Sequence, residues 1–190
     1  GQPFRQRGAV SENHRQQIRD AELVSNPGCY PQGFILLVKP LIDAGILETQ
    51  AALSCNAVSG YSGGGRQMIE EFEIGDTPKK QLLAVNDYSL TLNHKHVPEM
   101  RKYSGLTTKP LFLPTVASYY KGMIVRIPIH LETLTGSTGE TIVECLKESG
   151  KCVPKTVEQM NNSFYGSRLG KNEQQIHFLQ QNICTDSLEA

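Results

Sequence analysis

The sequence predicts an α+β fold, in which a mixed and largely antiparallel sheet carries helices on one face. Three patterns predict it. Residues 31–44 are apolar on nearly every side, as in a buried helix, and residues 138–149 form an amphipathic helical pattern. Between them, residues 123–131 alternate apolar and other side chains, as a half-buried strand does. A hydrophobic content of 38% over 190 residues is enough to form a core.

The N-terminal part begins with a polar arm, residues 1–20, followed by a predicted strand at 22–25. The apolar helix 31–44 comes next. Pro40 lies inside it and is expected to kink it or to end its regular part. Gly45 is placed to close the helix, because glycine adopts the left-handed conformation common after a helix C-terminus.

The central part contains shorter elements. The sequence predicts a strand at 51–59, a helical turn at 68–72, a helix from Val97 to a stop at Gly105, and a strand at 111–113. Within the alternating strand 123–131, Pro128 predicts an edge position or a bulge, because proline cannot donate to the ladder.

Composition excludes several classes of protein. Nineteen basic and nineteen acidic residues give a net charge of zero, which argues against a general nucleic-acid binder. No run approaches the roughly 20 apolar residues of a membrane span. The five scattered cysteines include no C-x-x-C pair, which argues against a metal site and favours a reduced, cytoplasmic protein. Neither a G-x-G-x-x-G fingerprint nor a P-loop occurs.

Cys29 stands out as a candidate nucleophile. It follows a bend at Gly28 and precedes Pro31, a residue favoured in the first turn of a helix. A thiol at a helix N-terminus lies near the positive end of the helix dipole, which favours the reactive thiolate. The alternative interpretation is a buried and inert cysteine.

A nucleophilic cysteine needs a base, and His94 and His96 are the candidates. They lie in the run N-H-K-H-V-P-E, just before the helix predicted from Val97. A helix N-terminus disfavours the imidazolium ion, so a histidine there stays neutral. Glu99 could orient one of the rings. The alternative is a capping turn with solvated histidines. The other three histidines are interpreted as surface residues: His14, His130 and His177.

The glycine-rich run 60–66 is a candidate anion-binding loop. Consecutive glycines, among them Gly63 and Gly64, allow close backbone approach and N–H groups that converge on an anion. Arg66 adds a planar cation suited to phosphate or carboxylate, and Ser62 adds a hydroxyl donor. A plain flexible loop is the alternative.

Three motifs in this order, N-P-G-C-Y-P, S-G-Y-S-G-G-G-R and H-K-H-V-P-E-M, resemble the N-acetyl-γ-glutamyl-phosphate reductase family of arginine biosynthesis. The similarity covers about residues 10–156. It implies a polar arm or linker at 1–20, the catalytic and dimerisation domain at 21–156, and a weakly matched tail at 157–190. The family also has an NADP-binding Rossmann domain, which is expected to be absent from this chain. The family's usual Pro-His after the short strand is here Pro114-Thr115.

The resemblance also implies roles. The family uses NADPH to reduce an acyl phosphate to an aldehyde through a cysteine thioester, and Cys29 matches the nucleophile. His96 is preferred as the acid/base and His94 as a substrate contact, although the reverse assignment stays open. The implied substrate contacts are Arg66, Ser62, Gly63, Gly64 and Glu99. The implied cofactor contacts are Asn26, Pro27 and Gly28.

The expected partners are a small acyl phosphate and further copies of the chain in a homo-oligomer, with no nucleic acid and no membrane. The family's sheet commonly forms the subunit interface, and the strand 123–131 is a candidate contributor. Two alternatives remain. One is a related semialdehyde dehydrogenase, such as the aspartate enzyme, and the other is a non-catalytic dimerisation fragment.

Overall fold

The computed structural model describes residues 19–22, 27–74, 84–131, 134, 136–149, 175–176 and 179–181. The helices are α2 (Cys29–Asp43), α3 (Gly65–Glu73), α5 (Val97–Ser104) and α6 (Gly139–Glu148), with the 3-10 helix η1 (Tyr61–Gly64). The strands are β1 (Ser54–Gly60), β2 (Val85–Asp87), β3 (Leu111–Ala117), β4 (Met123–Arg126), β5 (Ile129–His130), β6 (Gln175–Ile176) and β7 (Leu179–Gln181). The strand expected at 22–25 lies outside the described residues apart from Glu22, as do most of the arm and most of the tail.

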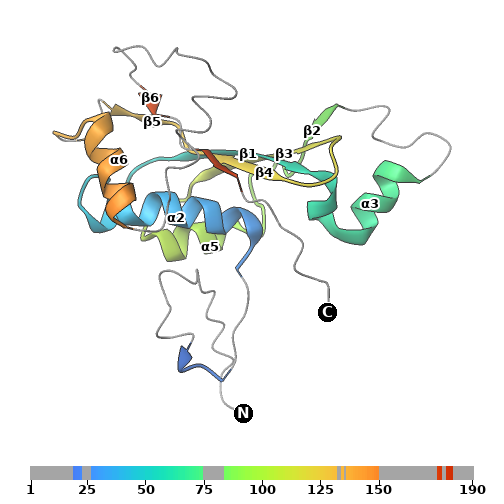
Figure 1. The fold of residues 1–190 in the computed structure, drawn as a ribbon, viewed down its shortest axis with the longest axis horizontal. Helices are drawn as coiled ribbons and strands as arrows, with labels where there is room; N and C mark the ends of the chain where they lie inside the picture. The colour runs from blue at the N-terminus through green and yellow to red at the C-terminus, as the bar shows by residue number, and fades with distance from the viewer. Residues whose placement is uncertain are drawn as a thin grey trace.

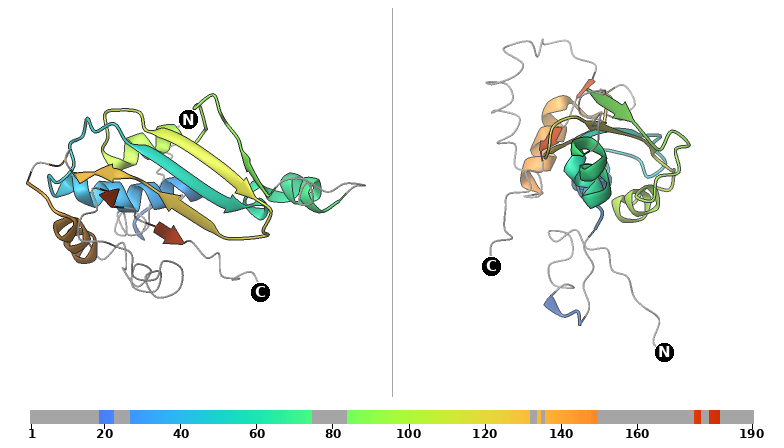
Figure 2. Two further views of the ribbon diagram at one scale, coloured as in Figure 1. Left: turned by 90° about the horizontal axis from the view of Figure 1, so that it is seen from above. Right: turned by 90° about the vertical axis from the view of Figure 1, so that its right-hand side faces the viewer.

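Five strands form the main sheet in the order β2-β3-β1-β4-β7, and β5 pairs with β6 in a separate ladder. Only the β1–β3 pair is parallel among these pairs of described strands. Helices α2 and α5 lie side by side on one face of the sheet, and α6 packs against α2 (Figure 1). Helix α3 extends beyond one end of the sheet (Figure 2). The predicted mixed, largely antiparallel sheet with helices on one face is confirmed.

Helix α2 is the buried helix that the sequence predicts. Gly28 is its extended N-cap, and the helix begins at Cys29, two residues earlier than the expected start at Pro31. Of the two outcomes expected for Pro40, a kink or an end, the structure contradicts the end, because the helix continues to Asp43 and Ala44 N donates to Pro40 O at 3.0 Å. A proline in the last turn removes one donor only, while the apolar face on both sides of it stays packed. Gly45, with φ +70°, closes the helix as expected.

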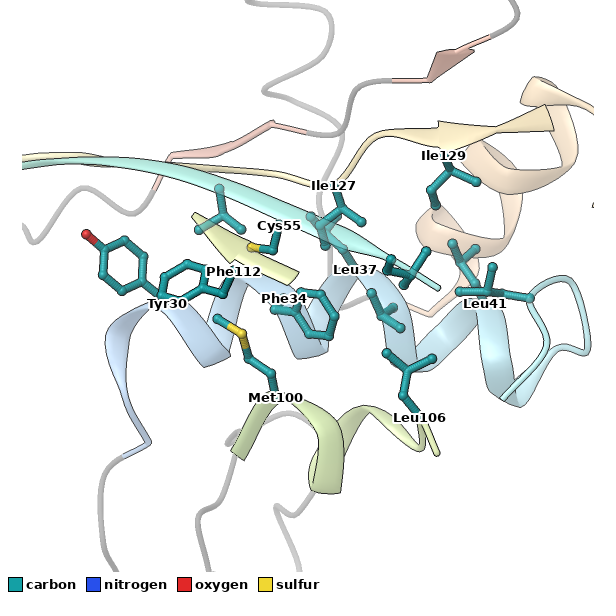
Figure 3. Close-up of a cluster of buried hydrophobic side chains, with 14 of the residues drawn as sticks. Tyr30, Phe34, Leu37, Leu41, Cys55, Met100, Leu106, Phe112, Ile127 and Ile129 are labelled. Carbon is teal, nitrogen blue, oxygen red and sulfur yellow. The ribbon is translucent and has the colours of Figure 1, made fainter. Parts of the chain in front are cut away.

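The core lies between α2, α5 and the sheet (Figure 3). Its largest side chains interdigitate from both layers, so that α2 is covered on nearly all sides, as its all-round apolar sequence requires. The core members labelled in the figure are Tyr30, Phe34, Leu37, Leu41, Cys55, Met100, Leu106, Phe112, Ile127 and Ile129.

Pro128 divides the predicted strand 123–131 into two. Strand β4 ends at Arg126 and β5 begins at Ile129, because proline offers no N–H to continue the ladder. Strand β4 before the proline is internal, between β1 and β7, whereas β5 after it belongs to a two-stranded ladder with β6. The alternation itself is confirmed: the buried positions in this stretch are Met123, Val125, Ile127 and Ile129.

The other face of the sheet carries apolar side chains that no described helix covers. Along β3, Leu111 and Leu113 alternate with buried neighbours and are 53% and 43% exposed. Half-buried Val58 of β1 and Ile124 of β4 are register partners on the same face. Among the described residues, no helix has the length and apolar character that crossing a bilayer requires.

Candidate active site

Cys29 occupies the first position of α2 and its thiol is exposed. The predicted placement of this cysteine at a helix N-terminus is confirmed, and its reactivity stays a prediction. The turn before it is half-buried at Pro27 and Gly28, while Asn26 lies outside the described residues. A thiolate at this position faces the positive end of the α2 dipole.

Helix α5 meets α2 at this turn. His96 is the N-cap of α5, and its ring packs directly on Gly28: a Cβ added there would lie 2.6 Å from the ring Nε2. Both oxygens of the Glu99 carboxylate accept from the Gly28 N–H at 3.2 Å. Glu99 therefore fixes the backbone before Cys29. The sequence had instead suggested that Glu99 could orient an imidazole ring.

The two histidines lie together, with ring centroids 4.6 Å apart. The His96 backbone N–H donates to Nδ1 of His94 at 3.2 Å, so a neutral His94 carries its proton on Nε2. Burial and the neighbouring charges of His94 and Lys95 lower the pKa of His96 to about 4. Burial and Lys95 also lower the pKa of His94. Both rings are therefore neutral near pH 7, as the sequence predicted.

One polar atom of this cluster has no partner. The Nδ1 of His96 is buried and makes no hydrogen bond in the structure. Leaving a buried polar atom unpaired costs roughly 1–3 kcal/mol, and such atoms in native structures are often found at functional sites. The charge of Glu99 is also disfavoured, since burial raises the pKa of its carboxyl group and the Gly28 N–H lowers it only in part.

A chain of three hydroxyls lies beside the thiol and was not anticipated as a unit. The Tyr30 hydroxyl donates to Ser59 Oγ at 2.8 Å and lies 3.0 Å from the Tyr88 hydroxyl. Burial raises the pKa of both tyrosines, and negative charge on Cys29 contributes in the same direction. The nucleophile motif itself contains Tyr30, but nothing in the sequence pattern marks Tyr88 as its neighbour.

Aromatic rings complete the cluster. The ring of His94 lies 5.1 Å from Phe112, 5.9 Å from Tyr88 and 6.2 Å from Tyr30. The Tyr30 ring is 5.9 Å from that of His96. Elements α2, β3, α5 and the segment after β2 thus contribute to a single aromatic wall around the two imidazoles.

In the glycine loop, several backbone N–H groups are already used in hydrogen bonds within the protein. The N–H groups of Tyr61 and Ser62 donate to the carbonyls of Tyr119 and Tyr120, and that of Gly65 donates within the turn. These groups are therefore not available to an anion. Arg66 is 91% exposed and its Nε lies 2.6 Å from Oε1 of Glu70.

The loop still approaches the cluster at one point, since a Cβ on Gly63 would lie 3.8 Å from Ser59 Oγ. The glycines themselves, Gly63 and Gly64, are exposed. The substrate-binding roles of Arg66, Ser62, Gly63 and Gly64 stay predictions.

The sequence matches the family model "semialdehyde dehydrogenase, dimerisation domain" over residues 29–182. Among curated relatives, an N-acetyl-γ-glutamyl-phosphate reductase from Burkholderia lata is 46% identical over 138 residues, which are 72% of this chain and 43% of that protein. A protein of the same name from Brucella ovis is 41% identical over 169 residues, covering 80% of this chain and 54% of that protein.

The chain thus spans about half the length of these curated relatives. Among solved structures, aspartate semialdehyde dehydrogenase II from Vibrio cholerae aligns with a TM-score of 0.49 at 16% identity, over 73% of this chain and 47% of that one.

Proposed function

Because the chain belongs to the semialdehyde dehydrogenase dimerisation-domain family, we propose that it carries the catalytic half of an NADPH-dependent acyl-phosphate reductase. The proposed reaction converts N-acetyl-γ-glutamyl phosphate into N-acetylglutamate semialdehyde and phosphate, in arginine biosynthesis. The carrying observation is the exposed Cys29 at a helix N-terminus, where the ring of His96, itself beside that of His94, packs on the preceding residue Gly28. The names of relatives at 41–46% identity support this substrate over aspartyl phosphate.

Cys29 is the proposed nucleophile. Its thiolate attacks the acyl carbon, a carbon–sulfur bond forms, and the carbon–oxygen bond to phosphate breaks to give a thioester and free phosphate. A thiolate suits both halves of the reaction, because it attacks readily and also leaves readily when the reduced adduct collapses to the aldehyde. Backbone N–H groups in the first turn of α2 are suited to stabilise the oxyanion that forms during the attack.

The histidines are the proposed acid/base and polarising groups. His96 is assigned the proton transfers, because its ring packs against the residue before Cys29 and is neutral at pH 7. His94 is assigned the substrate contact, because its Nδ1 is occupied by the His96 N–H and its Nε2–H is then a donor. Glu99 acts through the Gly28 backbone, in addition to any contact with substrate.

The family implies NADP, and the residues at the turn fit a cofactor that approaches from solvent. The thiol of Cys29 is exposed, and Pro27 and Gly28 before it are half-buried rather than sealed in the core. When bound, NADPH supplies the hydride that reduces the thioester. Pro27 and Gly28, together with the Asn26 of the sequence motif, are proposed to border the nicotinamide side of the site.

A second copy of the chain is the proposed partner, and the open face of the sheet is the proposed interface. The family description names a dimerisation domain, and Leu111 and Leu113 expose apolar surface on that face. The apolar side of the stretch 123–131 is turned into the core, so its contribution to an interface would come from Ile124 and Arg126. Sedimentation analysis of Leu113→Glu should show a shift from dimer to monomer. An unchanged sedimentation coefficient would argue against this interface.

The cytoplasmic location stays a prediction.

The decisive assay uses a protein in which this chain is joined to a nucleotide-binding domain. We expect phosphate-dependent oxidation of N-acetylglutamate semialdehyde, and the NADPH that forms is measured by its absorbance. Aspartate semialdehyde is the matched control substrate. Faster turnover of aspartate semialdehyde would overturn the substrate assignment, and turnover without phosphate would overturn the acyl-phosphate chemistry.

A further inference from the structure

We propose that Tyr30 is a positioning residue for Cys29: its hydroxyl, held between Ser59 and Tyr88, fixes the first turn of α2 and thereby the thiol. This inference rests on the proposed role of Cys29 as nucleophile. It concerns how the thiol is held, not which reaction it performs.

The hydroxyl of Tyr30 is held from two sides. It donates to Ser59 Oγ at 2.8 Å in a buried contact, and the Tyr88 hydroxyl lies 3.0 Å away. Since Tyr30 donates to Ser59, its oxygen is the acceptor for Tyr88. The side chain is only 3% exposed. Removing the hydroxyl would leave both partners facing a gap in an otherwise close-packed region.

The partners come from elements that are far apart in the sequence. Ser59 is the next-to-last residue of β1. Tyr88 follows β2, and its backbone N–H donates to Pro114 O of β3 at 3.1 Å. The hydroxyl chain therefore fastens the start of α2 to two points of the sheet, 29 and 58 residues away from Tyr30 in sequence.

The position of Tyr88 is itself fixed by an unusual turn. Ser89 and Leu92 both adopt positive φ, at 55° and 58°, and Leu92 N donates to Ser89 O. Non-glycine residues rarely adopt this conformation, and such residues cluster at functional sites. The turn connects Tyr88 to His94, and their rings lie 5.9 Å apart. The segment from Tyr88 to His94 thus supplies both a hydrogen-bond partner of Tyr30 and a histidine of the site.

The consequence for Cys29 follows from its place in the chain. Tyr30 is the next residue, so the Tyr30 anchor restrains the backbone on one side of the thiol, while Glu99 restrains Gly28 on the other. The dipole and N–H groups of α2 stabilise a thiolate only if the sulfur stays aligned with them. Among the described residues, the ionisable groups around this turn include Glu99 of α5, His94 and His96 before it, and Tyr88.

The test measures alkylation of Cys29 by iodoacetamide in the 190-residue chain as a function of pH, with the adduct quantified by peptide mass spectrometry. We expect Tyr30→Phe to slow alkylation near pH 6 by about three- to tenfold, the worth of a typical hydrogen bond, and to leave the high-pH plateau unchanged. Ser59→Ala and Tyr88→Phe should act in the same direction. The double variant Y30F/S59A should be no slower than Y30F alone, because both changes break one chain of contacts.

Tyr61→Phe is the matched control. Tyr61 is 5% exposed and its hydroxyl also donates to a side chain, Glu73, but it belongs to a different cluster. This variant also removes a tyrosine hydroxyl that donates to a side chain, and it should keep the wild-type pH profile. It therefore tests whether a general loss of stability changes the profile. If Y30F fails to fold, S59A and Y88F carry the same test, because each keeps the Tyr30 ring in the core.

The two proposals fail in different ways. A wild-type profile with the ordinary thiol pKa of about 8.5 would contradict the poised thiolate and hence the proposed function. A poised wild-type thiol whose profile is unchanged in folded Y30F, S59A and Y88F would overturn the role of Tyr30 alone. A profile shifted equally by Y61F would assign the effect to stability and would also overturn that role.

Discussion

The α2–α5 junction and the glycine loop are both marked by short, clear motifs, but they differ in how many distant residues contact them. At the junction, Gly28 contacts both His96 and Glu99, and Tyr30 is buried among side chains from three elements. At the loop, Arg66 is solvent-exposed and pairs with Glu70, four residues along its own helix. One motif is held by distant parts of the chain, and the other is held mainly by itself and by the Tyr119–Tyr120 turn.

This difference shows that the packing around a motif, and not the motif alone, determines how well its residues are organised. The junction is already organised: its rings are packed, its backbone is fixed and its histidines are neutral. Such organisation is what catalysis of bond-making steps requires. In the loop, Arg66 and Gly63 are exposed and loosely surrounded. We therefore expect substitutions at the junction to have large effects on chemistry or stability, and substitutions of Arg66 and Gly63 to have small effects on stability.

The largest effect is expected for Cys29→Ser in a protein that includes the nucleotide-binding part. The loss of the thiolate should lower turnover by more than about a thousandfold while folding is retained. Cys145→Ser is the control, because Cys145 lies in α6, where its thiol donates to Pro40 O at 3.6 Å, and has no part in the proposed chemistry. Steady-state kinetics and a circular dichroism spectrum check both. Substantial residual activity in C29S would remove Cys29 from the mechanism.

Gly28→Ala should be the most damaging small change at the junction. The added Cβ would lie 2.6 Å from the His96 ring, so the ring or the turn must move. We expect a loss of about 2 kcal/mol in the free energy of unfolding, typical of overpacking. Gly63→Ala is the matched change at the loop, where the nearest atom would be 3.8 Å away, an ordinary contact. Urea denaturation of both variants measures the contrast. Equal losses at the two glycines would mean that the junction is not the more tightly packed region.

The lowered histidine pKa values predict a pH dependence. The unfolded chain binds protons at His96 below pH 6.5, whereas the folded chain resists protonation until about pH 4. Stability should therefore fall as the pH is lowered from about 6.5 towards 4. His94 contributes with the same sign, and Glu99, whose pKa is raised, contributes with the opposite sign. Thermal midpoints of His96→Gln should fall less steeply over this range than those of the wild type. A wild-type slope in His96→Gln would contradict this contribution of His96.

The smallest effect on stability is expected for Arg66→Ala. The ion pair with Glu70 is solvent-exposed, and such pairs contribute less than about 0.5 kcal/mol in typical cases. Lys39→Ala removes another i,i+4 pair, with Asp43 of α2, and serves as the comparison. If Arg66 binds the anionic substrate as predicted, R66A alone should raise KM. An unchanged KM in R66A would confine the substrate contacts to the junction.

Patterns that depend on near neighbours could be read from the sequence. The buried helix α2, the amphipathic α6 and the alternating burial of 123–131 follow from spacing within each segment. Gly105 ends α5 at φ +91° as expected, since only local backbone geometry is involved. The fate of each proline was harder to predict. Pro40 is tolerated in α2 and Pro128 separates two strands, because packing on either side decides what a missing N–H costs.

For the site, the sequence by itself determined the three motifs and the position of Cys29 at a helix N-terminus, because helix starts are encoded within a few residues. Only the tertiary structure decided which distant residues contact these motifs. The Gly28–Glu99 contact joins residues 71 positions apart, and Tyr30 and Tyr88 are 58 apart. Such contacts depend on the order β2-β3-β1-β4-β7 and on the packing of α5 beside α2, which no local pattern specifies. The same dependence left Arg66 in solvent, since the sheet ends before α3 begins.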